Sequence, residues 1–191
     1  MRFALLLLLP ACGLGWIGTE DDRTAGLPTA GAGPYKRLEP DDLTPASEPR
    51  FLNDTRADVE DPSMLAGGAG LRVWFTRRTD EPVVSEIHYL EAPSAHQLPS
   101  VGPMAVLDAT ETWEEGVVSS PSVTRNPAGG LVMFYEGGVA TPSIGRAVSA
   151  DGVSWTKDGD PLLVGATSPS AVFVNGETWL FVTRPNEIGI W

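Results

Sequence analysis

The phrase Ser120-Pro121-Ser122-Val123 decides how this chain folds, together with the aromatic stretch Leu131-Val132-Met133-Phe134-Tyr135 and the stretch Ile144-Gly145-Arg146-Ala147-Val148-Ser149. Further copies start at Asp61-Pro62-Ser63 and at Ser168-Pro169-Ser170, and each leads into another aromatic stretch. The copies recur after about 50 residues, and a period of roughly 40–50 residues made of short strands is typical of propeller blades. The sequence therefore predicts an all-β fold containing a partial β-propeller.

The third copy ends within its phrase. Ile188-Gly189-Ile190-Trp191 aligns with residues 144–147, the middle of a predicted strand. Such a strand lacks a hairpin partner and leaves an open sheet edge, and propellers close with about four to eight blades. Residues 61–191 supply roughly two and a half blades on this count. We therefore expect the N-terminal blades of a longer protein; the alternative is a small open β-sheet protein that ends at Trp191.

The N-terminal part has the features of an exported protein. Residues 1–12 combine a positive start, a leucine run and Ala11 before the one cysteine, Cys12. This order is typical of a secretory signal, and its end resembles a bacterial lipobox, in which the cysteine is lipidated. Residues 13–60 are acidic and rich in Gly and Pro, as expected of a tether. We expect a lipid-anchored protein of the bacterial cell envelope; the alternative is a plain signal peptide with an incidental Cys12.

Composition and spacing argue against several other chemistries. The net charge of −12 disfavours nucleic acid as a partner, because phosphate binding requires a basic surface. His88 and His96 have no partnering cysteines at zinc-ligand spacing. The sequence also has no Gly-x-Ser-x-Gly elbow and no phosphate-binding glycine loop. We therefore predict no cofactor and no metal site.

The strand pattern after residue 60 gives expectations for each blade. Residues 71–76 and 131–135 are apolar and aromatic, which predicts buried innermost strands. Residues 143–149 suit the next strand of the second blade. Asp151-Gly152 predicts a tight hairpin turn after that strand, with Trp155 on the return strand.

The same phrases resemble a group of sugar-processing enzymes. The blade-opening Asp-Pro-Ser, the aromatic strand and the following Ile-Gly-x-Ala-x-Ser-x-Asp-Gly-x-x-Trp are similar to those of five-bladed propellers of the glycoside hydrolase family 43, 32 and 130 type. Residues 149–155 are also similar to the Asp-box of sialidase propellers. The resemblance implies a central funnel lined by acids and a carbohydrate ligand. It leaves two functions open, which are glycoside hydrolysis and non-catalytic binding of glycans or proteins.

Asp61 is the best-placed catalytic candidate that the resemblance implies. It matches an aspartate that precedes proline at the start of the first blade, where it would act as base or nucleophile. Glycoside hydrolysis needs two carboxyl groups at a defined separation. The equivalent residues in the later copies are Ser120 and Ser168, so the second carboxyl group is not visible in this pattern. The alternative for Asp61 is a turn residue that satisfies nearby backbone N–H groups.

Other candidates follow the aromatic strands. Glu136 and Glu187 come after such strands in the second and third copies, where the resemblance places the edge of the funnel, and are candidate acids. Arg77 and Arg78 follow the first aromatic strand and are candidates to bind a carboxylate or substrate. Trp113, between blades, is the aromatic residue expected to be exposed, where it would stack on a sugar. We expect Asp61, Arg77, Glu136 and Glu187 to meet on one face.

Overall fold

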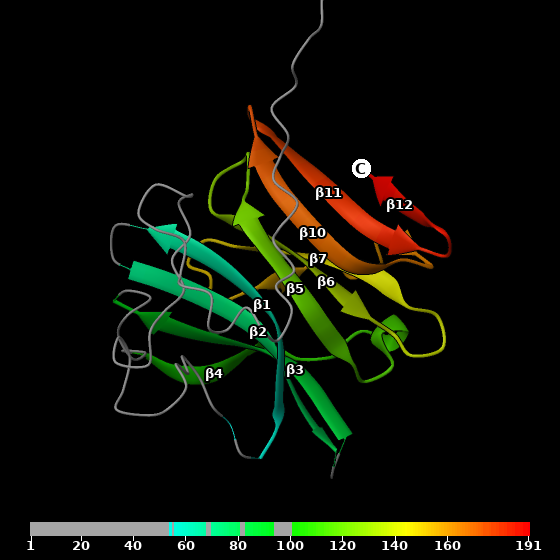
Figure 1. The fold of residues 1–191 in the computed structure, drawn as a ribbon, viewed down its shortest axis with the longest axis horizontal. Helices are drawn as coiled ribbons and strands as arrows, with labels where there is room; N and C mark the ends of the chain where they lie inside the picture. Colours follow the sequence, from blue (N-terminus) through cyan, green and yellow to red (C-terminus); the bar gives the residue numbers. More distant parts are fainter. Residues whose placement is uncertain (1–53, 55, 68–69, 81–82, 94–100) are drawn as a thin grey trace, which may run out of the picture. The chain divides into compact units, whose positions relative to one another are not determined.

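The computed structural model describes residues 54, 56–67, 70–80, 83–93 and 101–191. The predicted signal segment, Cys12 and nearly all of the predicted tether lie outside these residues. The described part folds into three antiparallel sheets (Figure 1), whose strands follow sequence order except for the last strand of the second sheet. It therefore has the all-β architecture of a partial propeller that the repeat predicts.

Each copy of the repeat forms one sheet. The first sheet contains β1 (Asp58–Gly67), β2 (Gly70–Asp80), β3 (Val83–Ala92) and β4 (Val101–Leu107). A short 3-10 helix, η3 (Thr112–Glu114), precedes the second sheet, which contains β5 (Val118–Arg125), β6 (Leu131–Gly137), β7 (Ser143–Ser149), β8 (Thr156–Lys157) and β9 (Leu163–Val164). The third sheet contains β10 (Thr167–Val174), β11 (Glu177–Arg184) and β12 (Glu187–Ile190).

A β-bulge recurs at the residue before proline in the first strand of every sheet. Asp61, Ser120 and Ser168 have φ values of 50°, 50° and 52°. The pairing with the second strand shifts register at each of these positions. Beyond the bulge, the serine that follows each proline pairs with the aromatic residue at the centre of the second strand; the pairs are Ser63 with Trp74, Ser122 with Phe134 and Ser170 with Phe181. The alignment of the three phrases is therefore confirmed in three dimensions.

The order of strands within a sheet corrects one expectation. The bulged strands β1, β5 and β10 lie beside one another and line a common pocket. Residues 71–76 and 131–135, predicted to be innermost, belong to β2 and β6 and are the second strands of their sheets. These second strands are strongly apolar because other strands flank them on both edges and neighbouring sheets cover one face of β2 and both faces of β6.

Apolar side chains fill the spaces between consecutive sheets. The core between the first and second sheets contains Trp74, Ile87, Tyr89, Leu107, Val118, Val123, Leu131, Met133, Tyr135 and Ala147. The core between the second and third sheets contains Val132, Phe134, Ile144, Ala166, Leu180 and Val182. The second sheet thus packs one face against the first sheet and the other against the third, as layered β architectures require.

The turn after β7 fastens the second sheet to the first. The predicted hairpin is present, since β7 pairs with β8, but its loop spans residues 150–155 and is longer than a two-residue turn. Asp151 Oδ1 accepts hydrogen bonds from the backbone N–H groups of Val153 and Ser154, both at 2.8 Å. The indoles of Trp74 and Trp155 both donate to the Gly152 carbonyl, at 2.8 and 3.0 Å. The Asp-box-like segment is therefore a structural clamp.

The Asp151 carboxylate makes this clamp sensitive to acid. The backbone N–H groups of Ser154 and Val153 hold the pKa of Asp151 well below its usual value. A depressed folded-state pKa contributes stability above the unfolded pKa of about 3.9, and this contribution is lost as the pH falls. We predict that Asp151→Ala lowers the urea midpoint near pH 6, and that its difference from the wild type shrinks below about pH 3.9.

Asp160→Ala is the matched control, because Asp160 is an exposed aspartate of the following loop. It should leave the urea midpoint unchanged. An Asp151→Ala deficit that stays constant down to about pH 3 would contradict a role for the ionised carboxylate.

Candidate functional site

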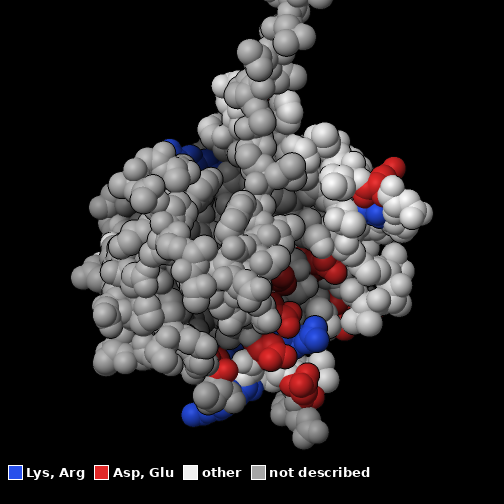
Figure 2. All heavy atoms as spheres, viewed as in Figure 1, with Lys and Arg blue, Asp and Glu red and all other residues white. Residues whose placement is uncertain are grey.

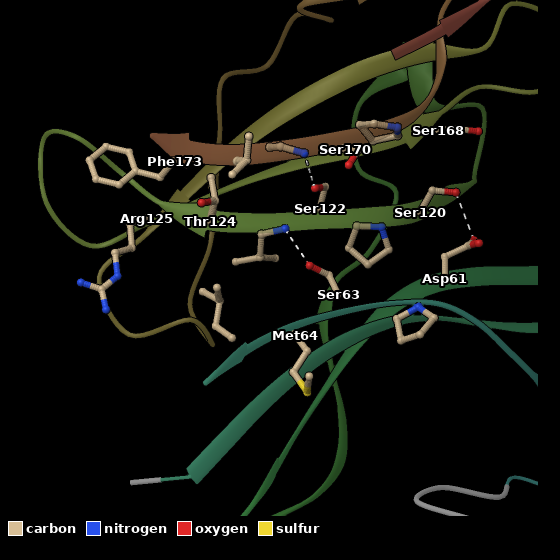
Figure 3. Close-up of a pocket in the computed structure, with 17 residues that line it drawn as sticks. Asp61, Ser63, Met64, Ser120, Ser122, Thr124, Arg125, Ser168, Ser170 and Phe173 are labelled. Carbon is tan, nitrogen blue, oxygen red and sulfur yellow. Dashed lines mark hydrogen bonds between the residues drawn. The ribbon is translucent and has the colours of Figure 1, made fainter. Parts of the chain in front are cut away.

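The first strands of the three sheets line a cavity of about 810 Å³ (Figure 3). Its wall is rich in hydroxyl groups, which come from Ser63, Ser120, Ser122, Thr124, Ser168 and Ser170. Asp61 and Arg125 are the charged residues among the described side chains that line it. Figure 3 shows Asp61, Ser120 and Ser168 at one end of the cavity and Arg125 with Phe173 at the other.

Asp61 is held in place by two hydroxyl groups. Its Oδ2 accepts a hydrogen bond from Ser120 Oγ at 3.1 Å and a longer one from Thr76 Oγ1 at 3.4 Å. Thr76 is buried, and its Oγ1 also accepts from the Ser120 backbone N–H at 2.8 Å. Since both contacts use Oδ2 and the Asp61 side chain is exposed, the carboxylate is oriented yet accessible to a ligand hydroxyl.

Glu136 occupies in β6 the position that Thr76 occupies in β2. Its Oε2 accepts a hydrogen bond from the backbone N–H of Ser168 at 2.9 Å, as Thr76 does from Ser120. Glu136 also pairs across the sheet with Ser119. The structure therefore brings Asp61 and Glu136 to the same end of the site, on either side of Ser120, although Glu136 does not itself line the cavity.

Two serines connect the cavity wall from strand to strand. The Val123 backbone N–H donates to Ser63 Oγ at 2.9 Å. The Ala171 backbone N–H donates to Ser122 Oγ at 2.8 Å. Because each serine lies one position beyond proline, the repeated phrase itself encodes these inter-sheet hydrogen bonds.

Arg77 and Arg78 lie away from the cavity. Arg77 Nε forms an ion pair with Asp54 Oδ2 at 2.8 Å. The Arg56 backbone N–H and the Arg77 guanidinium lower the pKa of Asp54. Arg78 lines a separate small hollow that also includes Asp54 and Asp58. Both arginines lie within β2, where Arg77 contacts Asp54 and Arg78 pairs across the sheet with Asp58, on a different part of the first sheet.

Trp113 lies in η3 and packs against the second sheet, where its side chain is half-buried. Its ring stacks on Tyr135 with the centroids 5.9 Å apart, and its Nε1 donates to the Gly159 carbonyl at 2.7 Å. The neighbouring Glu114 is fully buried and accepts a hydrogen bond from the Tyr135 hydroxyl at 2.8 Å. Burial and this glutamate raise the pKa of Tyr135. The position of Trp113 between blades predicted an exposed ring. This prediction is wrong because the ring packs on Tyr135 and bonds to Gly159, which are distant in the sequence.

Glu187 lies in β12, the third strand from the cavity. It is exposed and pairs across the hairpin with Arg184. Of the four residues expected to meet on one face, Asp61 and Glu136 therefore share the Ser120 end of the site, whereas Arg77 and Glu187 lie elsewhere. Within the described ranges, no group of three or more His, Cys, Asp or Glu side chains is arranged to hold a metal ion.

Arg125 is the charged lining residue that the sequence analysis missed. It ends β5 and is exposed at the end of the cavity opposite Asp61 (Figure 3). Arg125 lies in the strand that carries the Ser-Pro-Ser phrase, so the repeat could have identified it as a lining residue. The sequence analysis instead predicted that the second strands line the funnel.

Solved structures with the same fold include several glycoside hydrolases. A thermostable family-43 glycoside hydrolase matches with a TM-score of 0.60 and 18% identity over 73% of this chain and 55% of its own. An α-L-arabinofuranosidase from Lactobacillus brevis (TM-score 0.54, 19% identity, 65% and 45% coverage) and an endo-arabinase from Bacteroides thetaiotaomicron (0.53, 19%, 68% and 54%) also match. This chain spans about half the length of these proteins. Comparisons with protein-family models and with curated proteins found no match.

The hydrogen bonds across the cavity wall give a direct test of the site's construction. Ser122→Ala would leave the Ala171 N–H without its acceptor, at a cost of about 1–3 kcal/mol. We predict a corresponding loss in the free energy of unfolding, measured with urea.

Ser170→Ala is the matched control. Ser170 occupies the equivalent position in the third sheet and is exposed, so its loss should change the free energy of unfolding by less than about 0.5 kcal/mol. Equal losses in the two variants would contradict the inter-sheet role of Ser122.

Proposed function

We propose that this protein is an exported carbohydrate-binding propeller of the glycoside hydrolase type. The observation that carries the proposal is the hydroxyl-lined cavity, with one accessible carboxylate at its end, at the junction of the three bulged strands. The likeness of the fold to glycoside hydrolases supports it.

The chemistry of the wall suits a sugar. Serine and threonine hydroxyls both donate and accept hydrogen bonds, as ring hydroxyls of a glycan do. Phe173 and Met64 add apolar surface to the same cavity, and aromatic faces pack well against the C–H surface of a sugar ring. Asp61 would accept hydrogen bonds from one or two ligand hydroxyls, which are stronger when the acceptor is charged.

Hydrolysis places a further demand on the site. The reaction uses two carboxyl groups about 5–5.5 Å apart for retention or about 6.5–9.5 Å apart for inversion. Asp61 is the carboxylate among the described residues of the cavity wall. We therefore propose that the three sheets bind glycan, and that Asp61 serves as base or nucleophile only with an acid contributed by further sheets of a longer chain.

The rival function is non-catalytic binding of glycans or proteins in the cell envelope. Ser120 and Ser168 favour it, because the two later bulges carry hydroxyl groups where Asp61 carries a carboxylate. A binding protein needs no second acid. The two functions share the same cavity and differ in turnover.

We further propose that Cys12 carries a lipid anchor in the bacterial envelope. The support is the order of the N-terminal sequence, with a leucine run and Ala11 before this cysteine. About two lipid chains suffice for stable membrane attachment. No helix in the described part of the chain is long and apolar enough to span a membrane.

Glycan binding is tested by titrating the purified chain with oligosaccharides derived from arabinan, xylan and mannan, using calorimetry. We predict that at least one binds, and that Asp61→Ala weakens its affinity about tenfold or more, because a hydrogen bond to a charged group is worth about 1.5–3 kcal/mol. Asp80→Ala is the control, since Asp80 is exposed at the end of β2 and lines a different hollow. Absence of binding throughout the panel would refute the proposal.

The same purified chain assayed with aryl glycosides separates binding from hydrolysis. Because one lining carboxylate cannot provide both catalytic groups, we expect no turnover. Turnover that disappears in Asp61→Asn would show that the three sheets suffice for catalysis.

The anchor is tested by cell fractionation of the full chain expressed in bacteria. Wild-type protein should enter the membrane fraction, and Cys12→Ser should move it to the soluble fraction, because the acyl chains would be lost. Wild-type protein that is soluble and uncleaved would rule the anchor out.

A further inference from the structure

Arg125 is the basic residue of the cavity wall, and it has no acidic partner among the described residues. Its side chain is exposed at the end of β5. Within the part of the chain that the structure describes, it takes part in no hydrogen bond, ion pair or ring contact. A guanidinium stays charged at physiological pH and offers five N–H donors. Arg125 is therefore available to an anion that enters the cavity.

The other basic side chains that the structure describes lie close to acids or aromatic rings. The ion pairs are Arg77 with Asp54, Arg146 with Asp158 and Lys157 with Glu114, and the ring contacts are Arg72 over Trp74 and Arg184 over Trp191. Arg56 and Arg78 share a hollow with three aspartates. In Figure 2 acidic side chains gather in the lower part of the view, several of them next to basic ones. Arg125 thus differs from the other described basic residues, each of which has an acid or a ring nearby.

A smaller hollow of about 260 Å³ adjoins the cavity at Arg125. Arg125 and Leu65 line both spaces, and the half-buried Arg72 lines the hollow. Arg72 Nη1 donates to the Asp151 carbonyl at 3.1 Å, which fixes the guanidinium near this wall. Glu91 pairs with Arg72 across the sheet, but no acidic side chain is among the described residues that line the hollow. Two guanidinium groups therefore give this end of the cavity a positive potential.

The two ends of the cavity have opposite charges. Asp61 lies at one end and Arg125 at the other, with hydroxyl side chains between them (Figure 3). Asp61 contacts Ser120, which precedes Arg125 by five residues in β5. An extended strand rises about 3.3 Å per residue, so the two ends are roughly 16 Å apart. A ligand that reaches both ends is longer than one sugar ring, and its anionic group lies at the Arg125 end because Asp61 repels like charge.

We propose that this cavity binds an acidic oligosaccharide, whose carboxylate or sulfate group lies against Arg125. The inference rests on the proposed glycan binding and names the class of glycan. Both anions present pairs of oxygens, which match the planar fork of a guanidinium. Phe173 lies at the same end of the cavity and offers a ring face to the sugar that carries the anion. The neutral hydroxyl groups of the glycan extend from there along the serine-lined wall toward Asp61.

Pairs of ligands that differ only in charge test this inference. Tetragalacturonate and tetramannuronate are each titrated into the purified chain beside their carboxyl-reduced forms, and a galactotetraose sulfate is titrated beside galactotetraose. We expect at least one acidic ligand to bind about fivefold or more tightly than its neutral counterpart, because a charge-assisted pair with Arg125 is added. Added salt should lower this ratio, since it screens charges at an exposed site. The pair that shows the preference identifies the anion as carboxylate or sulfate.

Substitutions separate the contact with Arg125 from the rest of the site. Arg125→Gln should abolish the preference for the acidic ligand and leave the affinity for the neutral one unchanged. Arg146→Gln is the matched control, because it removes the same charge from an exposed arginine of β7 that lines neither the cavity nor the hollow. It should leave the preference intact. Asp61→Ala should weaken both members of a pair without lowering their ratio, because Asp61 contacts only neutral parts of the ligand.

The outcomes distinguish this inference from glycan binding itself. Equal affinities for acidic and neutral ligands overturn the acidic-glycan inference and leave glycan binding intact. The same holds for a preference that Arg125→Gln retains, or that Arg146→Gln also removes. A chain that binds neither member of any pair refutes glycan binding, and the acidic-glycan inference with it. The salt dependence is measured on the wild-type chain, so it tests the charged contact even where a variant loses its fold.

Discussion

A backbone N–H that points out of its own sheet is the feature on which the rest of this structure depends. At Asp61, Ser120 and Ser168 the chain adopts a left-handed conformation directly before proline, which is uncommon for residues other than glycine. The bulge turns the N–H of Ser120 toward Thr76 and that of Ser168 toward Glu136. Neighbouring sheets are thereby held in register at one end of the cavity, and the side chains of the bulged residues are placed at its rim. Strained backbone of this kind often occurs at binding sites.

Close packing behind the second sheet shows how the same repeat adapts to bulky residues. A Cβ atom on Gly145 would lie 2.4 Å from Tyr135 Cζ and 2.8 Å from Trp113 Cη2. Glycine at this position therefore leaves room for the Trp113–Tyr135 stack. Tyr135 in turn reaches the buried Glu114, which also receives Lys157 Nζ at 2.6 Å. The buried carboxylate is stable because its charge is paired and hydrogen-bonded.

The sequence was informative where the repeat acts locally and less so where contacts are distant. The Pro-Ser phrase and its aromatic partner predicted the strands and their pairing, because Ser122 and Phe134 face each other within one hairpin. The phrase did not reveal which strand of each sheet lines the cavity. An apolar sequence indicates that a strand is buried, and β6 is buried although it is the second strand of its sheet. The positions of Arg77 and Trp113 depend on Asp54 and Gly159, which no local pattern connects with them. Among the candidate acids, Asp61 and Glu136 lie at the same end of the site because each follows the repeat geometry, whereas Glu187 lies in the outermost strand of its sheet.

The distribution of acids around the cavity rim follows from the same hydrogen bonds. Asp61 accepts from Thr76 and Ser120, which are both neutral donors. Glu136 lies opposite Ser119 and accepts from the Ser168 backbone. An aspartate at position 120 would therefore lie against the Asp61 carboxylate, and neighbouring like charges oppose ionisation. Serine at this bulge instead donates a hydrogen bond to Asp61. The hydroxyl groups that replace acids in the second and third copies are thus compatible with carboxylates at Asp61 and Glu136, and they leave Asp61 as the acidic group that a ligand in the cavity can reach.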